Sequence, residues 1–311
     1  MQAQNFVGQH IIYERHCGHK GRQVGCLSFK VGDTVGRKSY GMDILFKIME
    51  INEKTQTAVL KGLDMRLIAD AKLDDLAYPD AKAIQSYRRR SEEAQKECIR
   101  KIYRRRSLER EQLRNLSGRS PEEFFELPGK ILHLDGDPEY LEECLKAYQS
   151  LQLDVVGEFV VEKEQPEKVW HLLHQHRPDI LILTGHDAYI KNEENDFQSL
   201  KYYRNSRYFV EAVKKARQYE PGKDDLVIFA GACQSHYEEL LNAGANFASS
   251  PQRVMIHALD PVFLMEKVAF TSINETVNIF EVIKHTITGL DGVGGLETRG
   301  KFRLGLPKSP Y

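Results

Sequence analysis

The sequence lacks most features that mark secreted, membrane-spanning or nucleic-acid-binding proteins. Its five cysteines are odd in number and scattered over 311 residues, which argues against a disulfide framework and fits a reducing cytoplasm. No apolar run approaches the ~18 residues of a membrane span, and the N-terminus has no apolar core of signal-peptide type. The net charge is only −1, so no overall field favours nucleic acid as a partner. We therefore expect a cytoplasmic protein without a membrane span or a nucleic-acid partner.

Metal motifs of standard spacing are lacking as well. His16, Cys17, His19 and Cys26 lie near one another, but they match no common zinc arrangement and a second cysteine pair is missing. We expect no metal and no other cofactor. Residues 1–26 are interpreted as an unpatterned N-terminal extension.

The composition is that of a globular protein, 41% hydrophobic and 29% charged, and the length suggests one large domain with something smaller. Residues 27–75 contain short β-rich runs separated by Gly, Asp and Asn turns, which predict a small SH3-like β-barrel. Residues 76–127 are crowded with arginine and glutamate and poor in β-branched residues. We expect them to form a solvated helical linker.

Residues 128–311 alternate between β and α patterns. We expect strands at residues 130–134, 155–161, 179–184, 225–230 and 253–258, with helices between them. The first, third and fourth of these runs are continuously apolar, as in parallel strands covered on both faces. The pattern predicts an α/β domain with a doubly wound, mostly parallel sheet.

Chemically useful side chains follow the expected strands. In open α/β sheets, ligands bind beyond the carboxyl ends of the strands, and His186 and Cys233 follow the third and fourth strands. Because a thiol needs a nearby base to become a nucleophile, we predict Cys233 as the nucleophile and His186 as its base. His236 is a rival base. The backbone N–H of Gly185 or of Cys233 could bind an oxyanion.

Other interpretations of Cys233 stay open. A free cysteine often behaves as a small buried hydrophobe, so the chain could be a binding protein in which Cys233 is inert. It could also be a thiol amidase that acts on a small substrate.

The interval of about 50 residues between the histidine and the cysteine resembles that of caspase-like proteases. That superfamily usually has a glycine after the histidine, whereas this chain has Asp187, and this departure leaves the oxyanion donor open. A closer resemblance is to the YabG family of sporulation-specific proteases. It is carried by the segments at residues 31–33, 37–41, 133–138, 183–187, 229–236, 245–251 and 297–305.

The family resemblance implies a caspase-like cysteine endopeptidase that acts in the mother-cell cytoplasm and at the forming spore coat. Its implied substrates and partners are spore coat and cortex-associated proteins, cut after basic residues, chiefly arginine. It also implies self-cleavage, and it places the catalytic pair on Cys233 and His186. The sequence does not indicate an oligomeric state.

Specificity for arginine calls for a buried carboxylate that accepts the guanidinium N–H groups. Asp135 and Asp137 follow the first expected strand and Asp260 follows the last, so these three are candidates for the arginine pocket. Alternatively, Asp137 and Asp260, each followed by proline, merely cap the next helix.

Self-cleavage is expected in the arginine-rich linker, because exposed connectors are where nicking concentrates. The alternative is a stable helix, supported by Glu–Arg pairs at helical spacing, which would resist cleavage. The candidate residues are Arg88, Arg89, Arg90, Arg104, Arg105 and Arg106.

Overall fold

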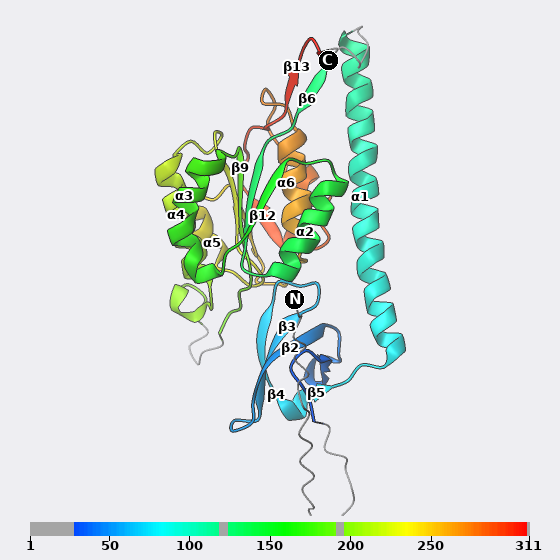
Figure 1. The fold of residues 1–311 in the computed structure, drawn as a ribbon, viewed down its shortest axis with the longest axis vertical. Coiled ribbons are helices and arrows are strands. Elements are labelled where there is room, and N and C mark those ends of the chain that lie inside the picture. Colours follow the sequence, from blue (N-terminus) through cyan, green and yellow to red (C-terminus); the bar gives the residue numbers. More distant parts are fainter. Residues whose placement is uncertain (1–27, 118–123, 191–195, 310–311) are drawn as a thin grey trace, which may run out of the picture.

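The computed structural model describes residues 28–117, 124–190 and 196–309. An N-terminal β-sheet lies below a larger α/β unit, and one long helix runs beside the larger unit (Figure 1). The extension expected over residues 1–26 lies outside the described residues. Among the residues described, no helix combines the length and the apolar character needed to cross a membrane.

The N-terminal sheet is antiparallel, with the strand order β4-β3-β2-β1-β5. Its strands are β1 (Thr34–Arg37), β2 (Leu45–Asn52), β3 (Thr57–Gly62), β4 (Ile68–Lys72) and β5 (Leu76–Ala77). Strands β4 and β5 form the two edges and do not pair with each other, so the sheet of the described chain is open. The short β-strands expected in this region are thus present, but the closed SH3-like barrel is not confirmed. A short 3-10 turn, Leu73–Asp75, leaves only two residues for β5.

Helix α1 (Ala81–Ser117) is a single helix of 37 residues, in agreement with the helical prediction. It begins where the Asp80 side chain accepts a hydrogen bond from the N–H of Ala83 at 2.6 Å. The helix is not solvated on all sides, because Cys98, Ile102 and Arg106 are buried against the α/β unit. The expected linker is therefore a docked element.

The central sheet has the order β12-β11-β10-β9-β7-β8, and all neighbours are parallel except β11 and β12. Its strands are β7 (Ile131–Asp135), β8 (Val155–Phe159), β9 (Ile180–Thr184), β10 (Val227–Ala230), β11 (Phe247–Ser249) and β12 (Val293–Gly295). The order reverses between β7 and β9, where open α/β sheets form their binding crevice. The prediction of a mostly parallel α/β sheet is confirmed, whereas the likeness to the caspase fold stays a prediction.

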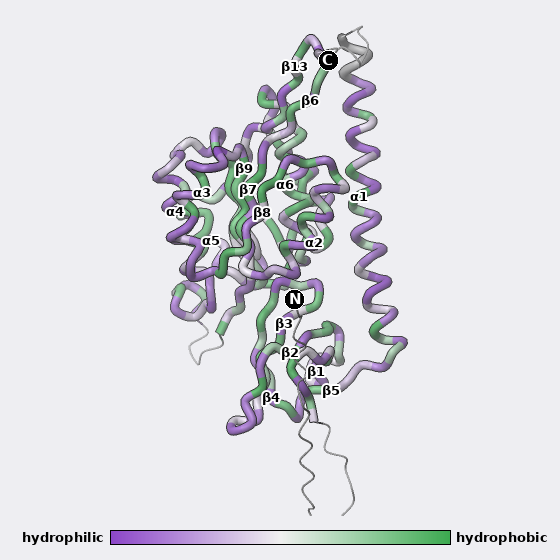
Figure 2. Tube along the Cα trace, in the orientation of Figure 1, coloured by the Kyte–Doolittle hydropathy of each residue, from purple (hydrophilic) through white to green (hydrophobic). Residues whose placement is uncertain are grey.

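Helices cover both faces of this sheet (Figure 1). They are α2 (Pro138–Ser150), α3 (Gln165–His176), α4 (Ser206–Tyr219), α5 (Tyr237–Asn242), α6 (Asp260–Phe270) and α7 (Ile279–Ile283). A separate pair, β6 (Phe125–Leu127) with β13 (Arg303–Gly305), lies near the end of α1. Figure 2 shows hydrophobic central strands flanked by largely hydrophilic helices, as expected for a sheet buried on both faces.

The strand predicted at residues 253–258 is wrong. The fifth parallel strand is β11, which has only three residues and begins after Asn246. The Asn246 amide fixes the start of β11 by accepting a hydrogen bond from the N–H of Ile228 and donating one to the carbonyl of Lys223, both at 2.9 Å. The apolar run at residues 254–256 lies outside the sheet and contacts the N-terminal sheet instead.

The two sheets share a small core at the carboxyl edge of the central sheet. Val35, Phe46 and Leu60 of the N-terminal sheet are buried in one cluster with Cys233 and Ile256. The N-terminal sheet therefore covers the edge at which the catalytic residues are predicted (Figure 1).

Candidate active site

Neighbouring strands bring His186 and Cys233 to the same edge. Strands β9 and β10 pair in parallel, with Leu183 opposite Ala230, and each candidate follows shortly after its strand. Tyr140 of α2 lies beside one of them, because its ring is 5.3 Å from the ring of His186. Burial and the nearby Asp137 and Cys233 groups raise the pKa of Tyr140 well above its usual range.

The thiol of Cys233 is completely buried. Its Sγ accepts a hydrogen bond from the N–H of Ile256 at 3.2 Å and donates to the carbonyl of the same residue at 3.6 Å. Burial is the main cause that raises the pKa of Cys233 far above its usual value. In this covered state the sulfur is therefore a thiol and not a thiolate.

His186 lies between two carboxylates. Its Nδ1 is 3.3 Å from Glu162 Oε1, and its Nε2 is 3.3 Å from Asp137 Oδ2. Burial alone would lower the pKa of His186, but Asp137 and Glu162 outweigh it and raise the pKa. The two carboxylates thus favour the charged form of the imidazole.

Gly185 makes room for one of these carboxylates. A Cβ atom on Gly185 would lie 2.3 Å from Glu162 Oε1, so a side chain there would push Glu162 away. The same oxygen accepts the backbone N–H of His186 at 2.7 Å. Gly185 therefore lets Glu162 orient His186, and its role as an oxyanion donor stays a prediction.

Asp135 forms an ion pair with an arginine of the chain itself, and its role in an arginine pocket stays a prediction. Arg66, in the loop between β3 and β4, is completely buried. Its Nη1 donates to Asp135 Oδ2 at 2.8 Å, and its Nη2 donates to the carbonyl of Ala258 at 2.9 Å and to Cys144 Sγ at 3.3 Å. The partners of the Arg66 side chain thus come from the end of β7, from α2 and from the segment before α6.

The other two pocket candidates have different surroundings. Asp137 caps α2 by accepting the N–H groups of Glu139 and Tyr140, and it also pairs with Lys61 Nζ at 2.8 Å. Asp260 accepts backbone N–H groups from His257 at 3.0 Å and from Ile287 at 2.6 Å. The described contacts of Asp260 include none to Arg66, so among the three candidates the geometry favours Asp135 as the arginine-binding residue.

The rival base His236 is directed elsewhere. Its Nε2 contacts the carbonyl of Gln198 at 2.8 Å, and its Nδ1 lies 3.3 Å from Glu238. None of its described contacts is with Cys233. The described side-chain contacts of His186 include none with Cys233 either, so the choice of His186 over His236 stays a prediction.

One group in the described chain has the donor set of a metal site. Ligand-type atoms of His133, Asp135 and Cys144 lie within 4.8 Å of one another. The guanidinium of Arg66 already donates to Asp135 and Cys144 at this point. In this structure the cation of the cluster is therefore an arginine side chain.

The candidate cleavage sites in the linker all lie within α1. Arg88, Arg89, Arg90 and Arg104 are exposed on the helix, whereas Arg105 and Arg106 bind Glu266 of α6 through hydrogen bonds of 2.6–2.7 Å. Cleavage at any of them would require local unwinding, because a protease binds an extended segment. Self-cleavage in the linker stays a prediction.

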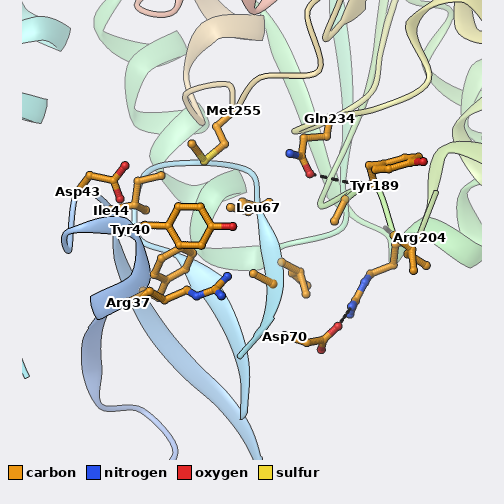
Figure 3. Close-up of a pocket in the computed structure, with 15 residues that line it drawn as sticks. Arg37, Tyr40, Asp43, Ile44, Leu67, Asp70, Tyr189, Arg204, Gln234 and Met255 are labelled. Carbon is orange, nitrogen blue, oxygen red and sulfur yellow. Dashed lines mark hydrogen bonds and ion pairs between the residues drawn. The ribbon is translucent and has the colours of Figure 1, made fainter. Parts of the chain in front are cut away.

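A cavity of about 430 Å³ is lined by Gln234, the residue that follows Cys233, but not by Cys233 or His186 themselves. It lies between the N-terminal sheet, which supplies Tyr40 and Leu67, and the loops that follow β9 and β10, which supply Tyr189 and Gln234 (Figure 3). The backbone N–H of Tyr189 donates to Gln234 Oε1 at 3.3 Å and joins the two loops. The cavity offers room next to the position of Leu67.

Three residues of the site had no place in the sequence interpretation. Glu162 follows the end of the second expected strand, so its position alone could have suggested it. Lys61 and Arg66 come from the N-terminal sheet, and no sequence pattern connects them with residues at the carboxyl edge of a distant sheet.

The known proteins to which this chain is similar are peptidases. The family model described as YabG peptidase U57 matches residues 30–307. The chain is also 44% identical over 287 residues to the sporulation-specific protease YabG of Bacillus subtilis (strain 168), and the alignment covers 90% of this chain and 99% of that protein. With nearly the whole chain matched by the family model and by this relative, the protein belongs to the YabG peptidase family.

Proposed function

We propose that this peptidase is a sporulation-specific cysteine endopeptidase that cleaves after arginine. Cys233 is the nucleophile, His186 exchanges the proton, and Asp135 reads the arginine side chain. The observation that carries the proposal is the buried pocket at Asp135, in which an arginine is bound while its carbonyl accepts the N–H of Cys233 at 3.2 Å.

The chemistry follows from this arrangement. An oxyanion that forms at the carbonyl of the bound arginine would accept a hydrogen bond from the N–H of Cys233. Backbone N–H donors of this kind stabilise acyl-transfer intermediates. Asp137 and Glu162 keep the imidazolium of His186 in place, so that it can protonate the leaving amine. The raised thiol pKa belongs to the covered state, and attack requires the thiol to be deprotonated with His186 as the acceptor.

A peptide substrate fits the site better than a small amide does. The segment at residues 256–258 offers the Ile256 carbonyl and the Ala258 N–H as an antiparallel edge, and both are used by the backbone of the chain itself. A small-molecule thiol amidase needs no such edge. An inert Cys233 in a binding protein would leave the pairing of His186 with two carboxylates unexplained.

The cellular role is inferred from the family. The Bacillus subtilis relative is named a sporulation-specific protease, and we extend this to spore coat and cortex-associated proteins as substrates and partners in the mother-cell cytoplasm and at the forming spore coat. The caspase-like character of the fold belongs to the same proposal. It is supported by the order of the strands, with the histidine and the cysteine after neighbouring strands.

The test compares cleavage of short fluorogenic peptides that carry Arg, Lys or Ala before the scissile bond. We expect Cys233→Ala and His186→Ala to lose at least about a thousandfold in kcat/KM, while the circular dichroism spectrum stays that of the wild type. His236→Ala is the matched control and should keep most activity. Equal cleavage of the arginine and alanine peptides, or near-normal activity of either dyad variant, would refute the proposal.

A further inference from the structure

The loop between β3 and β4 lies along the site as a substrate would. The N–H of Arg66 donates to the carbonyl of Ile256 at 3.1 Å, and the carbonyl of Asp64 accepts the N–H of Ala258 at 2.8 Å. Met65 and His257 form an antiparallel bridge between these bonds. Pairing of an extended peptide with an exposed backbone edge is a general mode of peptide recognition.

The side chain of Arg66 is completely buried, which is unusual for a charged residue in a loop. Burying a guanidinium is unfavourable unless its charge and its N–H groups are all matched. Here the carboxylate of Asp135, the carbonyl of Ala258 and the sulfur of Cys144 provide the partners. A complete set of partners for arginine, positioned beside Cys233, indicates a specificity pocket that the chain fills with its own residue.

The backbone of Arg66 is next to the reacting groups. Its carbonyl accepts the N–H of Cys233 at 3.2 Å. The carbonyl of Ile256 accepts both the N–H of Arg66 and the thiol of Cys233, so the sulfur and the Arg66 backbone converge on the same oxygen. Leu67, the residue that follows Arg66, lines the same cavity as Gln234.

The loop is also braced from three directions. Tyr140 of α2 donates to the carbonyl of Met65 at 2.6 Å, Lys61 pairs with Asp137, and Tyr87 of α1 donates to Asp64. The substrate-like position is therefore built into the fold, with both the central unit and the long helix holding the loop.

We propose that the Arg66–Leu67 peptide bond is an internal substrate, which the enzyme cuts in its own chain and which blocks the site until it is cut. The inference rests on the proposed function. His186 in its neutral form would take the proton of the Cys233 thiol, the sulfur would bond to the carbonyl carbon of Arg66, and the C–N bond to Leu67 would break as the amine of Leu67 takes that proton from His186. Water would then split the thioester, leaving a carboxylate on Arg66 and a thiol on Cys233.

Cutting this bond would not release the N-terminal part at once. Strands β3 and β4 stay paired from Thr57 with Lys72 to Lys61 with Ile68. The break does, however, free the end at Arg66 from the continuous turn into β4. Arg66 could then leave the pocket, so that an arginine of another protein could enter.

The decisive experiment follows the new N-terminus by mass spectrometry in the full-length protein during incubation. Wild type should yield a fragment that begins at Leu67, at a rate unchanged by tenfold dilution because the bond is seated within its own chain. Cys233→Ala should stay whole, even when active wild type is added. Arg66→Lys keeps the charge but not the planar fork, and we expect at least about tenfold slower cutting. The matched control, Arg88→Lys with Arg89→Lys and Arg90→Lys, should be cut at the wild-type rate.

The outcomes separate the two proposals. Wild type that cleaves arginine peptides while residues 66 and 67 stay joined would overturn the internal substrate and leave the proposed function intact. A new N-terminus only within residues 88–106, or a rate that scales with concentration, would also overturn it. If neither the peptides nor the chain is cut, the proposed function itself fails. If Arg66→Lys is cut slowly because it is misfolded, its circular dichroism spectrum will differ from that of the wild type. In that case the position of the new N-terminus in wild type and its rate on dilution still test the internal substrate.

Discussion

The ion pair of Arg66 with Asp135 should be one of the most strongly coupled pairs in the molecule. Both side chains have no exposed area, and the charged atoms lie 2.8 Å apart. Arg66 keeps the pKa of Asp135 well below its usual range although burial alone would raise it. Removing one partner of a buried pair leaves an uncompensated charge and typically costs about 3–5 kcal/mol.

A double-mutant cycle measures this coupling. In the Cys233→Ala background, which keeps the chain whole, we expect Asp135→Asn and Arg66→Met each to lower the free energy of unfolding by about 3 kcal/mol. The double variant should lose far less than the sum, because neither charge is then buried alone. The expected coupling energy is about 2–3 kcal/mol, measured by urea unfolding.

The pair formed by Arg37 and Asp75 provides the control. Its atoms are 3.0 Å apart, but the two side chains remain 23% and 18% exposed, so its coupling should stay below about 1 kcal/mol. If the Arg66 cycle gives no more coupling than this control, Arg66 is not bound in a pocket that requires its charge. The basis for the specificity of Asp135 would then be lost.

Two further predictions concern His186 and α1. Because its carboxylate neighbours raise the pKa of His186 above 6.5, its contribution to stability should be complete below pH 6.5 and lost as the pH rises through the raised value. Urea unfolding of Cys233→Ala with and without His186→Gln across this range checks the sign, and a difference that grows with pH would contradict it. Glu266→Gln weakens the bonds to Arg105 and Arg106 and should lower the free energy of unfolding by about 3 kcal/mol. Amide hydrogen exchange in α1 should become faster, and unchanged exchange there would show that these pairs do not hold the helix.

The strands that position the candidate dyad could be predicted from the sequence. Residues 180–184 and 227–230 are continuous apolar runs, and in the structure both are completely buried parallel strands. Their ends are followed by His186 and Cys233, so the rule that ligands gather at the carboxyl edge selects these two residues as candidates. Asp135 could be found in the same way because β7 has the same pattern.

The remaining parts depend on contacts that no local pattern encodes. Strand β11 is short and its position is fixed by the side chain of Asn246, whereas the more apolar residues at 254–256 form the edge that pairs with the loop of Arg66. Arg66 itself looks like an ordinary charged residue in a turn. Only the docking of the N-terminal sheet on the central sheet brings it to Asp135.

Because of this docking, the N-terminal sheet is not a separate binding module but supplies Arg66, which neutralises Asp135. Asp135 is completely buried, and a buried carboxylate needs either a cation or several hydrogen-bond donors. When Arg66 leaves, Asp135 still accepts the N–H of Asp137 and the hydroxyl of Thr184, both at 3.0 Å. These donors can keep the carboxylate ionised in an empty pocket, but they do not neutralise it, so the site favours the entry of another guanidinium. The same electrostatic need that holds Arg66 in the intact chain would thus select arginine in the substrates.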